Sequence, residues 1–98
     1  MAKFSDILAQ HSNVLIDFSA VWCGPCQVLG PILKEVKSHY ADRLSVIKID
    51  VDKNNELARH YRVQGVPTLI LFKEGQQVWR QSGVLSKESL IEIIDQHS

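Results

Sequence analysis

The sequence contains no long hydrophobic run, no excess of charge of either sign and only two cysteines. No segment approaches the roughly 20 consecutive apolar residues that a membrane-spanning helix requires, so we do not expect an integral membrane protein. The 11 Lys and Arg residues balance the 11 Asp and Glu residues, and neither sign forms a long block. A basic surface for nucleic acid or anionic lipid is therefore not expected, and partners should be recognised locally.

The first residues, Met1 to Asp6, also lack a long apolar stretch followed by a small-residue cleavage site. This pattern indicates no export signal, so we expect a cytoplasmic protein. Reducing thiol pools keep ordinary disulfides open in the cytoplasm, and a lone cysteine pair there is typical of catalysis or metal binding. A structural disulfide across so short a loop would also add little stability.

The sequence has no internal repeat, low-complexity tract or linker, so residues 1–98 are expected to form one domain. Hydrophobic periodicity and capping residues predict helices and strands in alternation. The expected helices are Phe4 to Gln10, Pro25 to Tyr40, Asn55 to Tyr61 capped by Asp52, and a last helix capped by Ser86. The expected strands are Val14–Ser19, Ser45–Val51, Thr68–Lys73 and Gln77–Gln81. This order predicts an α/β fold with a mixed sheet and helices on both faces.

The two cysteines lie in Trp22-Cys23-Gly24-Pro25-Cys26, where an apolar strand pattern changes to a helical one. A cysteine at a helix start meets unpaired backbone N–H groups and the positive end of the helix dipole, which favour its thiolate. Cys23 is therefore the candidate nucleophile, and Cys26 is the candidate resolving cysteine.

Zinc binding is an alternative use of the same pair, because a CxxC motif supplies two zinc ligands. A zinc site needs about four ligands, and the remaining candidates are four scattered histidines without the spacing of a zinc finger. We therefore expect no metal site. The zinc content of the purified protein would decide between the two uses.

Two motifs together resemble those of the thioredoxin family: Trp22-Cys23-Gly24-Pro25-Cys26 after a strand, and Gly65-Val66-Pro67-Thr68 at the start of a hairpin. The resemblance runs from about Val14 to Asp95. It implies a thioredoxin fold and reversible dithiol–disulfide exchange, in which Cys23 attacks a substrate disulfide and Cys26 resolves the mixed disulfide. The result is a Cys23–Cys26 disulfide.

The resemblance also implies that the chain binds no cofactor of its own. Its partners would be proteins that contain disulfides and a thioredoxin reductase, a flavoprotein that draws on NADPH. The Gly-Pro dipeptide resembles that of the reducing members of the family. A non-catalytic module with the same fold is the alternative, and a cellular phenotype that survives Cys23→Ser would favour it.

Two charged residues, Asp17 and Lys48, interrupt apolar strands. A carboxylate in a strand covered on both faces would be desolvated and have a raised pKa, whereas a solvent-facing position would leave it ordinary. The resemblance gives Asp17 the role of proton relay to Cys26. It places Lys48 near Asp17, where its ammonium would lower the pKa of that carboxyl; the alternative is a solvated lysine whose stem covers the sheet.

The resemblance further implies a substrate groove around the cysteines. Pro67, at a strand entrance by its position alone, would follow a cis peptide bond and lie against the cysteine pair. The groove would be formed by Trp22, Gly24, Pro25, Val66 and Gly83. Gly83 either permits close approach of the substrate backbone or simply ends the hairpin.

The sequence departs from the family pattern at two places. Ser19 stands where the family usually has a tryptophan, which affects packing beside the active-site helix. Only Met1 to Lys3 precede the first helix, too few for the strand with which the family fold begins. We therefore predict four strands in the order 2-1-3-4 and an exposed edge at Ser45–Val51. We expect a monomer, with dimerisation through this edge as the alternative.

Overall fold

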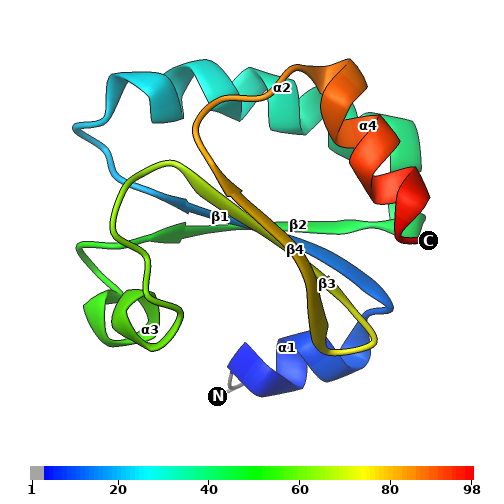
Figure 1. The fold of residues 1–98 in the computed structure, drawn as a ribbon, viewed down its shortest axis with the longest axis horizontal. Coiled ribbons are helices and arrows are strands. Elements are labelled where there is room, and N and C mark those ends of the chain that lie inside the picture. Colours follow the sequence, from blue (N-terminus) through cyan, green and yellow to red (C-terminus); the bar gives the residue numbers. More distant parts are fainter. Residues whose placement is uncertain (1–3) are drawn as a thin grey trace.

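The computed structural model describes residues 4–98, which form a four-stranded sheet, four α-helices and one short 3-10 helix (Figure 1). The strands are β1 (Asn13–Ser19), β2 (Ser45–Asp50), β3 (Thr68–Lys73) and β4 (Gln76–Ser82). The helices are α1 (Phe4–Gln10), α2 (Gly24–Tyr40), η1 (Ala41–Arg43), α3 (Asn55–His60) and α4 (Lys87–Gln96). The predicted bounds agree with these to within one residue.

The strand order is β2-β1-β3-β4, which confirms the predicted order. Strand β1 pairs in parallel with β2 and antiparallel with β3, and β3 forms the antiparallel hairpin with β4. The sheet is therefore mixed, and β2 lies at one of its edges.

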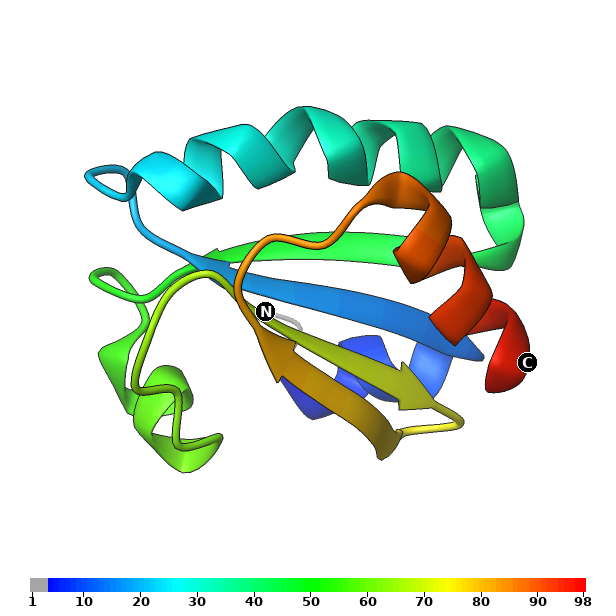
Figure 2. The same ribbon diagram turned by 45° about the horizontal axis from the view of Figure 1, so that its top comes forward.

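Helices cover both faces of this sheet. Helices α2 and α4 lie on one face and α1 and α3 on the other, as the two ribbon views show (Figures 1 and 2). Each pair of helices encloses its own hydrophobic cluster, and burial of apolar surface on both faces stabilises the layered arrangement.

Strand β1 separates the two clusters because successive side chains of a strand point to opposite faces. Val14, Ile16 and Phe18 belong to the cluster on the α1 and α3 side, whereas Leu15 belongs to the cluster under α2. By the same alternation, Asp17 and Ser19 face α2. The strand therefore directs two polar side chains into the layer that carries the cysteines.

The predicted cap of α3 is wrong. Asn54 rather than Asp52 occupies the N-cap position, and its side chain makes no capping hydrogen bond. The Asp52 carboxylate instead accepts a hydrogen bond from the Trp22 indole at 2.7 Å. The side chain that the local sequence assigned to the helix cap therefore forms a tertiary hydrogen bond with Trp22 instead. The predicted cap of α4 is confirmed, because Ser86 Oγ accepts the Ser89 N–H.

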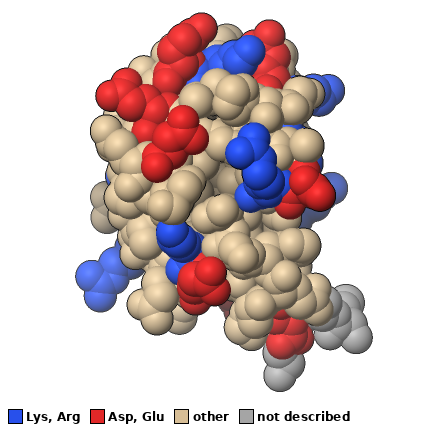
Figure 3. Space-filling view, turned by 90° about the vertical axis from the view of Figure 1, so that its right-hand side faces the viewer, with Lys and Arg blue, Asp and Glu red and all other residues tan. Residues whose placement is uncertain are grey.

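The prediction that Met1 to Lys3 are too few for a first strand lies outside the described residues. Within residues 4–98, no helix is long and apolar enough to cross a membrane. On the face shown in Figure 3, acidic and basic side chains lie in small groups separated by uncharged surface.

Candidate active site

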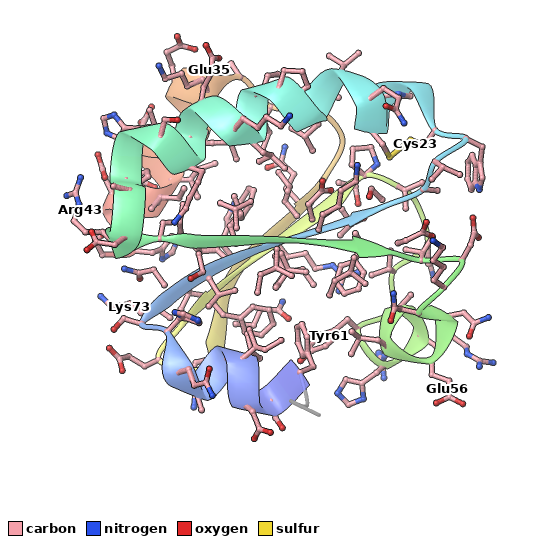
Figure 4. All side chains as sticks on the ribbon, turned by 180° about the vertical axis from the view of Figure 1, so that it is seen from behind. Cys23, Glu35, Arg43, Glu56, Tyr61 and Lys73 are labelled. Atoms are coloured by element: carbon pink, nitrogen blue, oxygen red, sulfur yellow. A yellow bond between two sulfur atoms is a disulfide. The ribbon has the colours of Figure 1, made fainter. Side chains whose placement is uncertain are left out.

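Cys23 and Cys26 lie at the start of α2, at the same end of the sheet as α3 (Figure 4). Cys23 is the N-cap residue, and the two cysteines form a disulfide with a Cα–Cα distance of 5.3 Å. The Cys26 N–H donates a hydrogen bond to Cys23 Sγ at 3.2 Å. The sequence predicted the pair at a junction between a strand and a helix, and the structure confirms this position.

This position favours a negative charge on Cys23 Sγ when the disulfide is open. Unpaired N–H groups at a helix start, together with the helix dipole, stabilise an anion there. Both cysteines are buried, and Cys23, at 5% exposure, is more accessible than Cys26, at 1%. The arrangement therefore gives the two sulfurs unequal access.

The surroundings of the disulfide are apolar. Ala20 is buried with the two cysteines, and Val51 and Val66 pack against this cluster. Exclusion of water from the sulfurs strengthens the interaction of a thiolate with the backbone N–H groups around it. The site is thus suited to a thiolate that is held by backbone dipoles rather than by a charged neighbour.

The segment before β3 forms the other wall of the site. The Val66–Pro67 peptide bond is cis, as the resemblance implied. The Val66 carbonyl oxygen lies 3.6 Å from Cys23 Sγ, so backbone groups of this segment are directly beside the sulfur. An extended substrate segment could pair with such groups by main-chain hydrogen bonds.

Gly83 lies beside this wall. Its N–H donates to the Pro67 carbonyl at 2.9 Å, and its φ of 98° lies in the region that favours glycine. It also directly follows the last residue of β4. Gly83 therefore ends the hairpin and adjoins Pro67, and its close approach to a substrate backbone stays a prediction.

Strand β4 also holds the loop that leads to Pro67. The Arg80 guanidinium donates hydrogen bonds to the carbonyl oxygens of Tyr61 and Arg62. Thr68 Oγ1 donates to the Gly65 carbonyl and lies 2.9 Å from Ser82 Oγ. These side chains fix the loop against the sheet on both sides of Val66.

The segments that carry the site expose several large apolar side chains. Trp22 is 69% exposed, and Val21, Val28 and Val84 are also large exposed apolar residues. Gly24 and Pro25 are exposed in the first turn of α2. The three valines and the Asp52 partner of Trp22 were missed by sequence reasoning. Asp52 is 30 positions from Trp22, and no local pattern signals such a contact.

Asp17 is buried under α2, which rules out the solvent-facing alternative. It is 1% exposed, and its Oδ1 has no hydrogen-bond partner among the described residues. Burial raises the pKa of this carboxyl to about 6, while the nearby Lys48 ammonium lowers it. A carboxyl with such a pKa can take up and release a proton near neutral pH.

Lys48 lies opposite Asp17 in the register of β1 and β2. Its side chain is exposed, so its charge reaches Asp17 from the edge of the sheet while remaining solvated. The two interpretations of this lysine, neighbour of Asp17 and solvated side chain, are therefore compatible.

Ser19 lies two residues beyond Asp17, on the same face of β1. It is completely buried, and its Oγ has no hydrogen-bond partner among residues 4–98. Two unpartnered polar atoms therefore lie in succession under α2, on the strand that leads to the cysteines. The departure from the family tryptophan leaves a small polar side chain at this point.

A metal site has no support from the geometry of residues 4–98. In this part of the chain, no three His, Cys, Asp or Glu side chains lie close enough together to hold an ion.

Comparison with known proteins identifies relatives that match most of the chain. The thioredoxin family profile matches residues 1–96. A thioredoxin-like protein of Synechocystis sp. is 48% identical over 93% of this chain and 88% of its own length. A Mycobacterium leprae protein named bifunctional thioredoxin reductase/thioredoxin is 46% identical over 90% of this chain, which spans 19% of that longer protein.

The fold has equally clear relatives among solved structures. A mutant thioredoxin from Halobacterium salinarum superposes with a TM-score of 0.89 at 40% identity, covering 98% of this chain and 83% of that one. The family profile, the sequence relatives and the solved structure indicate the same family as the cysteine pair at the start of α2. The chain therefore belongs to the thioredoxin family.

Proposed function

We propose that this chain reduces disulfides in other proteins by passing two electrons from Cys23 and Cys26. As a thioredoxin, the chain is a thiol–disulfide oxidoreductase. The direction of transfer and the roles of single residues are our proposal. The observation that carries it is the position of Cys23 Sγ, between the Cys26 N–H and the Val66 carbonyl.

In the first step, the Cys23 thiolate attacks one sulfur of the substrate disulfide. A new S–S bond forms between Cys23 and the substrate, and the other substrate sulfur leaves as a thiolate. Cys23 acts first because it is the more exposed of the pair and because its sulfur accepts the N–H bond at the helix start. Cys26, at 1% exposure, is protected from the substrate.

In the second step, the Cys26 thiolate attacks Cys23 Sγ and releases the second substrate thiolate. The Cys23–Cys26 disulfide forms, so the dithiol is oxidised by two electrons and the substrate is reduced by two. Cys26 must first lose its proton. Asp17 takes it up through water, since the pKa of about 6 makes this buried carboxyl a base at neutral pH. Lys48 keeps the Asp17 pKa from rising further.

The substrate lies across the wall of Val66 and Pro67. Its backbone pairs with Val66, while the exposed Trp22 and the first turn of α2 at Gly24 and Pro25 contact its side chains. Gly83, bonded to Pro67, leaves room for the substrate chain.

A thioredoxin reductase returns the electrons to the pair. The reductase holds FAD and draws on NADPH, and the cysteines are the only redox group that this chain needs. The Mycobacterium leprae relative is named as both a thioredoxin reductase and a thioredoxin, which supports this partner.

The same proposal covers the setting of the protein. Residues 1–98 work as one thioredoxin domain in the cytoplasm, where a supply of reductant lets the pair serve electron transport and redox homeostasis. The protein acts as a monomer. Edge pairing through β2 is the alternative, and the oligomeric mass in solution distinguishes the two.

Equilibration of the Cys23–Cys26 pair against glutathione buffers tests the direction of transfer. We expect the pair to stay oxidised until the buffer is strongly reducing, which is the behaviour of a reductant. A pair that is reduced already in mildly reducing buffer would identify an oxidant and contradict the proposal. The Cys23→Ser variant, which cannot form the disulfide, gives the baseline.

A further inference from the structure

The outer edge of β2 carries backbone groups that no described residue satisfies. The Val51 N–H donates to Ser19 of β1, and backbone groups alternate sides along a strand. The odd-numbered residues of β2 therefore face β1, and the N–H and C=O groups of Val46 and Lys48 point away from the sheet. None of residues 4–98 makes a hydrogen bond to these outward groups.

Side chains close this edge at both ends. Lys37 Nζ donates to the Leu44 carbonyl at 2.5 Å, and Asn54 Nδ2 donates to the Asp50 carbonyl at 3.0 Å. Between them, the outward groups of Val46 and Lys48 and the Asp50 N–H have no hydrogen-bond partner among the described residues. A second strand can therefore pair with the edge over a short stretch, and it cannot extend the sheet along its full length.

A cavity of about 470 Å³ lies directly beside the open stretch, between β2 and α2. Its walls are mostly apolar, with Leu33 and Gly30 from the helix and Val46 from the strand. Asp17, at 1% exposure, lies at its floor. An apolar side chain on a strand paired with Val46 would enter this cavity.

The rim of the cavity is basic. Lys34, Lys37 and Lys48 all line it, and its one acidic group is the buried Asp17. Lys34 and Lys48 are exposed, and neither forms an ion pair within residues 4–98. The Asp17 carboxylate offsets part of the Lys48 charge, and three lysines against one carboxylate leave the rim positive for an incoming strand with carboxylates on the α2 side.

The same charges disfavour a second copy of this chain. Antiparallel pairing of the open stretch with itself would bring two Lys48 and two Lys34 side chains to one edge. The register that would place Lys48 opposite Asp50 of the second copy is disfavoured, because the Asn54 side chain already donates to the Asp50 carbonyl and lies on that side of the strand. Like charges facing each other destabilise a strand pair.

We propose that the β2 edge and the adjacent cavity form a docking site for an extended segment of a partner protein that carries acidic residues around a central apolar residue. The segment pairs with Val46 and Lys48, places its apolar side chain in the cavity and meets Lys34 and Lys48 with its carboxylates. This site lies outside the Cys23 groove, and it shares Asp17 and Lys48 with the proposed proton relay to Cys26.

A synthetic peptide tests this site directly. The probe is a short acetylated peptide in which Glu, Leu and Glu alternate with Val and Thr, so that the acidic and leucine side chains share one face. We expect saturable binding, with a Kd in the micromolar to millimolar range, that slows amide hydrogen exchange at Val46 and Lys48. A probe with Lys in place of Glu should not bind.

Variants of the protein separate the contribution of the basic rim from that of backbone pairing. Lys34→Glu should raise the Kd roughly threefold or more. The matched control is Lys53→Glu, at an exposed lysine outside the cavity, and it should leave the Kd unchanged. Val46→Pro removes an outward N–H, without loss of pairing to β1, and should abolish binding. Lys34 lies on α2, so the result for Lys34→Glu does not depend on whether proline at position 46 disturbs the strand.

Three outcomes would overturn the proposal. They are absence of peptide binding, binding that leaves the Val46 and Lys48 amides unprotected, and protection of these amides by self-association at high protein concentration. The last would make a second copy the occupant.

Discussion

At the scale of single residues, the buried Asp17 carboxyl links the chemistry to stability. Its pKa of about 6 in the folded protein exceeds the ordinary value of 3.8. Between these values the folded state holds more protons than the unfolded state, so the free energy of unfolding falls as pH rises through this window. Above about pH 6 the folded protein carries the full cost of an ionised, desolvated carboxylate.

Asp17→Asn should therefore stabilise the protein at high pH and have little effect at low pH. We expect a gain in the free energy of unfolding of about 1–3 kcal/mol at about pH 8, and almost none at about pH 4. Urea unfolding of the oxidised protein across this range measures it. The exposed Asp42→Asn should show no such trend. A stability gain that is the same at both pH values would contradict the raised pKa.

Sequence identified Asp17 and Lys48 because each interrupts an apolar strand, whereas the choice between a buried and a solvent-facing Asp17 needed the structure. The same reasoning failed for Asp52. Its position before a helix predicted a cap, whereas its partner is the Trp22 indole, 30 residues away. A local rule cannot weigh such a contact. The unpartnered hydroxyl of Ser19 was likewise beyond prediction, since burial of a serine has no periodic signature.

At the scale of elements, the loop between α3 and β3 positions Val66 and Pro67. Arg80 on β4 holds this loop through the carbonyl oxygens of Tyr61 and Arg62. The half-buried guanidinium makes the attachment firm, because hydrogen bonds to a charged donor are stronger than neutral ones.

Arg80→Met should loosen the loop while it keeps much of the side-chain packing. We expect a loss of about 1–3 kcal/mol in the free energy of unfolding. We also expect a higher KM for a protein disulfide, with a smaller change in kcat. The reason is that the Val66–Pro67 segment binds the substrate and does not take part in the exchange between the sulfurs. Arg59→Met, an exposed arginine on α3, is the matched control. An unchanged KM in Arg80→Met would show that the loop holds its place without Arg80.

The order and extent of elements followed from hydrophobic periodicity, with errors confined to single terminal residues. Element ends are less predictable because the last hydrogen bonds depend on neighbours in space. Val51 illustrates this: its N–H bonds to Ser19, yet it lies beyond the end of β2. The cis bond before Pro67 came from the family resemblance, since no periodic pattern indicates it.

At the scale of the whole molecule, redox state and folding are linked. A pair that reduces other disulfides favours its own oxidised form when the protein is folded. The folded protein must then stabilise the disulfide relative to the unfolded chain. Oxidised protein should consequently resist unfolding better than reduced protein.

Thermal unfolding with and without a thiol reductant measures this linkage. We expect Tm to fall by several degrees on reduction, about 4–8 °C for each kcal/mol lost in a domain of this size. The Cys23→Ser and Cys26→Ser double variant should show no response to the reductant. A higher Tm for the reduced protein would mean that the pair acts as an oxidant.

The strand order and the exposed β2 edge were both predicted, since the strand that begins the family fold was not expected in this sequence. The basic cavity beside that edge was not predicted. It arises where Lys34, Lys37 and Lys48 come together from two elements. Charge balance over the whole sequence conceals such a local group.

The central claim is that Cys23 attacks and Cys26 resolves, and trapping of the mixed disulfide tests it most directly. Reduced Cys26→Ser protein is mixed with a protein that contains an accessible disulfide, and the products are mapped by mass spectrometry. The account predicts a stable covalent complex through Cys23, and none with Cys23→Ser. A complex that accumulates through Cys26 in the Cys23→Ser variant, with none in Cys26→Ser, would reverse the roles and contradict the account.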